Sequence, residues 1–152
     1  MERLGAPPAR PSPGRIHGAP RGAAPGSTVK VVILEDSPVA ALMLRLQVEQ
    51  YGYVPIVAGH LGALGEVLRP PVPRAFIIDR RLSDGDGLPA VRALRAAGFG
   101  GPILVTDGHA GAGARAEALA AGADGFVEKP TVGAQLHEAL LRAGLRRAPP
   151  TG

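Results

Sequence analysis

The sequence predicts an α/β protein with a doubly wound parallel sheet, and three observations lead to this prediction. From residue 29 onward, short apolar runs typical of buried strands alternate with amphipathic helical segments. The connections between them are short, which favours right-handed β-α-β units with helices on both faces of the sheet. The chain has 152 residues, 45% of them hydrophobic, which suits one domain with an aliphatic core because aromatics make up only 3%.

The composition also excludes several classes of protein. The chain has no cysteine, which excludes a disulfide scaffold, a thiolate metal site and a cysteine nucleophile. No apolar run approaches the roughly 18 residues that a membrane-spanning helix needs. A Gly-x-Ser-x-Gly nucleophile elbow and a Walker phosphate loop are also absent, so the sequence gives no support to a hydrolase or an ATPase.

The isoelectric point near 10.3 suggests a nucleic-acid partner, but the basic charge gathers in residues 1–28. Four arginines there face the single acid Glu2, which accounts for +3 of the formal net charge of +4. This segment is rich in Pro and Gly and predicts a disordered tail, either passive or acting as a weak anion-binding arm. The remaining body is nearly neutral, so the high isoelectric point says little about the partner of the folded domain.

Five strands and five helices are expected in alternation. The predicted strands cover residues 29–34, 53–57, 74–79, 102–106 and 125–127. The predicted helices cover residues 38 to about 50, 61–68, 87–97, 110–121 and 131 to about 146. Ser37 and Pro38 suit the N-cap and first residue of the first helix, and Thr131 is expected to cap the last one.

The helical segments also predict which side chains share a face. The first helix carries four apolar residues on one face: Val39, Leu42, Met43 and Leu46. The inward-facing residues expected in the third and last helices are Leu88, Val91, Leu94, Leu136, Leu140 and Leu141. The four histidines show no metal-ligand spacing and are interpreted as surface residues: His17, His60, His109 and His137.

Polar side chains follow the predicted strands, at the edge where a doubly wound sheet binds its ligand. They are Glu35 and Asp36 after the first strand, Asp79 after the third, Thr106 after the fourth and Lys129 after the fifth. Three converging carboxylates repel one another and attract a cation, and an all-oxygen ligand set suits Mg²⁺. Lys129 and the Thr106 hydroxyl would suit an anion beside that metal.

With these residues in place, residues 29–146 resemble a response-regulator receiver domain of the two-component signalling family. The resemblance rests on five motifs in register: the phosphoacceptor segment Asp79–Leu88, the acidic pair Glu35-Asp36, the switch hydroxyl Thr106, the aromatic switch residue Phe126 and the Lys129-Pro130 step. The peptide bond of that last step is usually cis in the family. The resemblance implies a flavodoxin-like, CheY-like fold with strand order 2-1-3-4-5.

The resemblance implies a role for each matching residue. Asp79 accepts a phosphoryl group from a histidine kinase or a histidine phosphotransfer protein. Mg²⁺ is held by Asp36, Asp79 and the backbone carbonyl of Arg81, with Glu35 acting through water. Lys129 pairs with the phosphoryl oxygens, Thr106 moves to bind them, and Phe126 turns inward. The surface formed by the helix 110–121, the strand 125–127 and the last helix then switches and binds a downstream protein.

Four residues depart from the family pattern or tune it. Ser83 stands where the family usually has proline. Asp107 directly follows the switch threonine and is expected to slow phosphorylation by repelling the incoming dianion; a further metal ligand and a solvent-facing side chain are the alternatives. Gly108 offers no side chain to orient an attacking water, and Arg81 could shield or clamp the phosphate. These two residues predict a long-lived phosphoryl state.

The leading interpretation is a cytoplasmic, single-domain response regulator, with the receiver at 29–146 between the tail 1–28 and a short C-terminal tail at 147–152. It would act by protein contact, without a DNA-binding domain, and would catalyse no more than its own phosphorylation and slow dephosphorylation. Homodimer formation stays open. Two alternatives remain: a degenerate receiver that binds partners without phosphorylation, favoured by Asp107, and a small Mg²⁺-dependent phosphoryl-transfer enzyme, disfavoured by the lack of a substrate-binding insertion.

Overall fold

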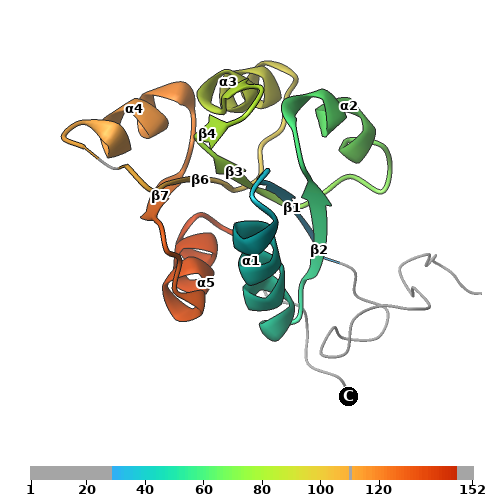
Figure 1. Ribbon diagram of the computed structural model, residues 1–152. Helices are drawn as coiled ribbons and strands as arrows, with labels where there is room; N and C mark the ends of the chain where they lie inside the picture. Colours follow the sequence, from blue (N-terminus) through green and yellow to red (C-terminus); the bar gives the residue numbers. More distant parts are fainter. Residues whose placement is uncertain (1–28, 110, 147–152) are drawn as a thin grey trace, which may run out of the picture.

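The computed structural model describes residues 29–109 and 111–146, so the predictions about the tails 1–28 and 147–152 lie outside the described residues. A five-stranded parallel sheet lies between two layers of helices (Figure 1). Its strand order is β2-β1-β3-β6-β7. This order confirms the predicted doubly wound fold and the arrangement 2-1-3-4-5 of its five sheet strands.

The predicted strands and helices are present, most of them with boundaries shifted by a few residues. The sheet strands are β1 (Lys30–Leu34), β2 (Val54–Ala58), β3 (Ala75–Asp79), β6 (Ile103–Asp107) and β7 (Gly125–Glu128). The helices are α1 (Pro38–Gln50), α2 (Leu64–Val67, after a 3-10 turn at Leu61–Ala63), α3 (Leu88–Ala96), α4 (Ala114–Ala121) and α5 (Gly133–Arg142). The sequence did not predict the hairpin β4 (Arg81–Leu82) and β5 (Gly85–Asp86), because two-residue strands leave no periodic pattern.

The sheet separates two apolar cores. On one face, Val31 and Ile33 of β1 pack with residues of α1 and α5; on the other, Val32 and Leu34 pack with residues of α3 and α4. Figure 1 shows the same division, with α1 and α5 on one side and α2, α3 and α4 on the other. Burial on both faces explains the nearly continuous apolar strands. Among the described residues, no helix has the length and apolar character that a bilayer crossing requires.

Helix α1 begins as predicted but buries a different face. The hydroxyl oxygen of Ser37 accepts a hydrogen bond from the Ala40 N–H at 3.4 Å, and Pro38 is the first helical residue. The buried residues of this helix are Ala41, Leu44 and Val48. The four apolar residues predicted to share a face do so, but they are 40–71% exposed: Val39, Leu42, Met43 and Leu46. Helix α1 therefore presents an apolar face to solvent.

Helices α4 and α5 start later than expected. Helix α4 begins at Ala114, after Gly113, whose φ of 89° lies in the left-handed region and interrupts a regular helix. The predicted cap of α5 by Thr131 is wrong: the N-cap position is Val132, which makes no side-chain cap. The Thr131 hydroxyl instead donates to Gln47 Oε1 at 2.8 Å and so connects the start of α5 to α1.

The prediction that Leu141 faces inward is also wrong, because this residue is exposed while His137 is buried. The surface interpretation of His137 therefore fails as well. Its ring stacks on Tyr51 with a centroid distance of 4.0 Å, and its Nε2 lies 3.0 Å from Tyr53 Oη. A buried histidine needs such polar partners. Residues 51 and 53 follow α1, so this cluster joins the end of α1 to α5.

We expect Gly87→Ala to destabilise the protein and to shift the backbone at Asp79. A Cβ at position 87 would lie 2.2 Å from the Asp79 backbone oxygen and 2.9 Å from Ile78 Cγ2. Such overpacking typically costs about 1–3 kcal/mol. Gly65→Ala in α2 is the matched control, because a Cβ there meets nothing within 4 Å, and it should stabilise by about 0.5–1 kcal/mol. Urea unfolding of both variants tests this, and equal effects would contradict the close approach.

Candidate functional site

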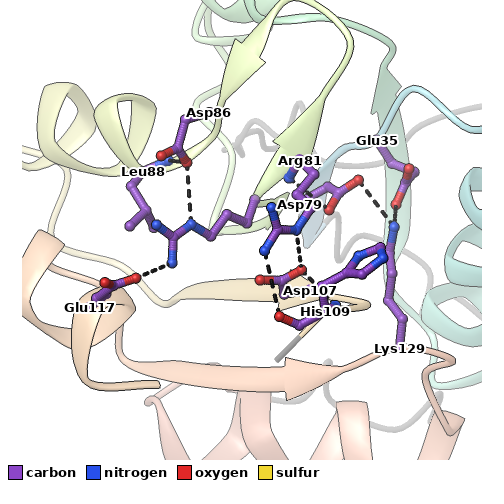
Figure 2. A network of polar contacts seen from close by, with 10 residues as sticks. Glu35, Asp79, Arg81, Asp86, Leu88, Asp107, His109, Glu117 and Lys129 are labelled. Atoms are coloured by element: carbon purple, nitrogen blue, oxygen red, sulfur yellow. Dashed lines mark hydrogen bonds and ion pairs between the residues drawn. The ribbon is translucent and has the colours of Figure 1, made fainter. Parts of the chain in front are cut away.

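The residues that the sequence singled out meet at the carboxyl edge of the sheet. Glu35 and Asp36 follow β1, Asp79 ends β3, and Lys129 follows β7. The register of β3 and β6 places Asp79 directly beside Thr106. Figure 2 shows Glu35, Asp79 and Lys129 converging. The parallel strands thus bring together side chains that lie far apart in the sequence.

Lys129 joins two buried carboxylates. Its Nζ donates to Asp79 Oδ2 at 3.0 Å and lies 2.7 Å from Glu35 Oε1. The exposed fractions of Asp79 and Glu35 are only 4% and 2%. Backbone N–H groups bind the other oxygens: Arg81 donates to Asp79 Oδ1 at 3.1 Å, and Ser37 donates to Glu35 Oε2 at 3.1 Å. Both carboxylates are therefore held in fixed positions.

Burial and charge act against each other on these groups. Burial raises the pKa of Glu35, and its contacts with Lys129 and the Ser37 N–H only partly offset this, so the pKa stays above its ordinary value. Burial lowers the pKa of Lys129, but the carboxylates of Glu35 and Asp79 outweigh it and raise the pKa overall. Lys129 is therefore charged at neutral pH.

The three carboxylates fit a small divalent cation. Oxygen atoms of Glu35, Asp36 and Asp79 all lie within 4.8 Å of one another, which makes an acidic cluster of the oxygen ligands that Mg²⁺ prefers. Hydrogen bonds from Ser83 lower the pKa of Asp36, and the Ser83 backbone N–H is one of the donors. A proline at position 83 would lack this N–H. The serine at this position therefore stabilises the charged form of Asp36.

Thr106 and Phe126, the two expected switch residues, are both buried. Within residues 29–109 and 111–146, Thr106 Oγ1 has no hydrogen-bond partner, which is costly for a buried hydroxyl. The guanidinium of Arg115 lies over the Phe126 ring, 5.8 Å from its centroid, and donates to the Phe126 carbonyl at 3.3 Å. The Lys129-Pro130 peptide bond is cis, as the resemblance implied.

Asp107 has a different place from those the sequence offered. Its side chain is fully buried, so it does not face solvent, and it lies outside the acidic cluster. Its Oδ1 accepts from Arg81 Nε at 2.9 Å and from the His109 N–H at 2.9 Å. Burial raises the pKa of Asp107, but these two donors outweigh it and the pKa lies below its ordinary value. The sequence placed Arg81 and Asp107 after neighbouring strands but did not predict that they form an ion pair.

The doubly wound fold and the acidic cluster at its carboxyl edge agree with the predicted receiver domain, and comparison with known proteins identifies the family. The response regulator receiver domain family matches residues 31–141, so the chain belongs to that family. Receiver domains are signalling domains of two-component response regulators. The expected resemblance is thereby confirmed.

Relatives and solved structures agree with this assignment. The photosynthetic apparatus regulatory protein RegA of Rhodobacter capsulatus is 28% identical over 82% of this chain and 68% of its own length. The transcriptional regulatory protein TorR of Escherichia coli is 35% identical over 74% of this chain and 47% of its own length. A LuxR-family response regulator from Aurantimonas has 28% identity and a TM-score of 0.69, covering 81% of this chain and 90% of that one. The chain thus spans about half to two thirds of these curated relatives.

We expect Lys129→Met to destabilise the fold by on the order of 3 kcal/mol at pH 7, because two buried carboxylates lose their shared cation. Contact with Lys129 lowers the pKa of Glu35, so the removal of Lys129 should raise this pKa further above its ordinary value, and the folded variant should take up a proton at a higher pH than the unaltered protein does. Lowering the pH from 7 toward 5 should therefore reduce the loss in the variant. Urea unfolding with a chelator present measures this, and a loss independent of pH would contradict the shared-cation account.

Proposed function

We propose that this chain accepts a phosphoryl group on Asp79 from a phosphohistidine of a partner protein and passes the change to a downstream protein. The observation that carries the proposal is the buried hydroxyl of Thr106, which lies beside Asp79 in the sheet register and has no hydrogen-bond partner in the part of the chain that the structure describes. A phosphoryl group on Asp79 would give this hydroxyl an acceptor. Family membership and the acidic cluster support the same reaction.

In the proposed step, a carboxylate oxygen of Asp79 forms a bond to phosphorus while the phosphorus–nitrogen bond of the phosphohistidine breaks. The electron pair of that bond returns to the imidazole, which takes a proton from solvent. Asp36, Asp79 and the Arg81 carbonyl would hold Mg²⁺, with Glu35 acting through water, and the ion would neutralise charge on the transferring group. Lys129 would turn from Asp79 to the phosphoryl oxygens, and Thr106 would donate its hydroxyl to one of them.

The exposed apolar face of α1 suits the docking of the phosphodonor protein. Val39 and Met43 line a groove of about 290 Å³ together with Lys129 and Pro130, so the groove reaches the site itself. An exposed apolar surface of this kind is typical of a protein interface. A donor seated on it would lie next to the edge that carries Asp79.

The surface of α4, β7 and α5 suits the downstream partner. Phe126 lies on β7 under the guanidinium of Arg115, which belongs to α4. An inward movement of the ring behind Thr106 would remove one partner of Arg115 and so alter the surface between α4 and β7. Local changes of this kind bias a two-state element.

We expect one phosphoryl group to be added when the protein is incubated with Mg²⁺ and phosphoramidate. Intact-mass measurement should show a single adduct, labile to hydroxylamine as an acyl phosphate is. Asp79→Asn should show none, and chelation of Mg²⁺ should abolish the adduct in the unaltered protein. A protein that stays unmodified with this donor and with histidine kinases would instead support phosphorylation-independent binding.

We also expect Leu42→Arg on α1 to slow phosphoryl transfer from a protein donor by about tenfold, because it places a charge in an apolar contact. Transfer from phosphoramidate, which needs no docking, should be unchanged. Val72→Arg is the control, because Val72 is exposed to a similar degree (55% against 52%) and is not part of α1. Equal transfer rates for both variants with the protein donor would contradict the proposal that the donor docks on α1.

A further inference from the structure

The two arginines that follow Asp79 make contacts with α4 and with the segment that precedes it. Arg80 makes ion pairs with Glu117 of α4 and with Asp86, whose Oδ1 lies 3.5 Å from Arg80 Nε. Arg81 binds Asp107 at the end of β6 and, at 3.5 Å, the backbone carbonyl of His109. Figure 2 shows Arg81 extended across the site from Asp79 toward Asp107 and His109. The turn formed by residues 79–81 is thus connected to α4 and to the segment that leads into it.

The Arg80–Glu117 and Arg81–Asp107 ion pairs differ in burial. The Glu117 side chain is 61% exposed, so water can solvate its charge if Arg80 leaves. The Asp107 side chain is 0% exposed, and among the described residues its Oδ2 has no hydrogen-bond partner. A buried carboxylate that loses its cation is strongly destabilised. The Arg81 side chain is 56% exposed, so its polar contacts with Asp107 and the His109 carbonyl hold it in place more than packing does.

Arg81 also touches the reacting group. Its backbone N–H donates to Asp79 Oδ1, while its guanidinium binds Asp107. A phosphoryl group on Asp79 would add about 1.5–2 negative charges and three acceptor oxygens beside this residue. The phosphoryl group and Asp107 would then compete for one guanidinium.

We propose that Asp107 is a positioning residue that holds Arg81 away from the phosphoryl site and, both directly and through Arg81, holds His109 against the turn formed by residues 79–81. Phosphorylation would draw Arg81 away from Asp107 and loosen the segment that leads into α4. This inference rests on the proposed phosphorylation of Asp79. It differs from direct repulsion of the dianion by Asp107, because its effect on the phosphoryl group passes through Arg81.

The lifetime of the phosphoryl group separates these two accounts. In hydrolysis a water oxygen bonds to phosphorus, the Asp79 oxygen–phosphorus bond breaks, and carboxylate and inorganic phosphate are released, with the water's protons passing to phosphate and solvent. Asp107→Asn frees Arg81 to cover the phosphoryl oxygens and should lengthen the lifetime about tenfold, a typical coupling between neighbouring groups. In the Arg81→Gln background the same change should have no effect. Glu117→Gln, the matched loss of an exposed carboxylate from an arginine, should change the lifetime less than twofold.

Two results would overturn the proposal: an unchanged lifetime in Asp107→Asn, or the same lengthening with and without Arg81, which would mean direct repulsion. Hydrogen exchange in the unphosphorylated protein provides a second test that needs no phosphodonor. The amide of His109, which donates to the Asp107 carboxylate that Arg81 holds, should exchange about tenfold faster in Arg81→Gln than in the unaltered protein, while the amides of β1 stay unchanged. Unaltered exchange would overturn the tie even if Asp79 is phosphorylated. Faster exchange in a protein that forms no acyl phosphate would support the role of Arg81 in holding His109, and would reject only the link between this contact and phosphorylation.

Discussion

The carboxyl edge of the sheet depends on Lys129, because this one side chain neutralises part of the charge of two buried carboxylates. Glu35 and Asp79 are almost fully buried, and each would be costly without a cation nearby. Asp36 adds a third negative charge at the rim of the same cluster. One lysine against three carboxylates leaves an excess of negative charge, which lowers stability but favours binding of a cation. The residues at this edge therefore lower the stability of the fold but allow a cation to bind, a compromise that is common at functional sites.

Beside this lysine-centred group of charges lies a second ion pair, which is formed by an arginine. Lys129 serves the carboxylates that follow β1 and β3, whereas Arg81 serves Asp107 at the end of β6. Thr106 precedes Asp107 on the same strand and has a buried hydroxyl without a partner in the described part of the chain. A new anion on Asp79 would meet two cations that already have carboxylate partners, and a hydroxyl that has no partner among the described residues. Its binding would therefore redistribute existing contacts as well as add new ones, and this redistribution can carry a signal.

The fold and most of the site could be predicted because both depend on local signals. Apolar runs mark the strands. Glu35 and Lys129 come directly after a strand and Asp79 is the last residue of one, so the parallel topology alone brings them together. Details set by packing could not be predicted. The small Ala41 belongs to the buried face of α1, so the larger Leu42 and Leu46 stay outside. His137 is buried because Tyr51 and Tyr53 surround its ring, a contact between residues more than 80 positions apart.

The exposed apolar face of α1 and the charged edge of the sheet lie next to each other and would contribute differently to the binding of a partner. Apolar contact gives a partner affinity, while charge at the rim decides orientation and discriminates between partners. Met43 and Lys129 line the same groove, so a partner that buries the methionine also approaches the ammonium group that pairs with Asp79. A face of α1 turned fully to the core would have added stability but no such surface. The unexpected orientation of this helix thus places an exposed apolar surface beside the residues that would receive the phosphoryl group.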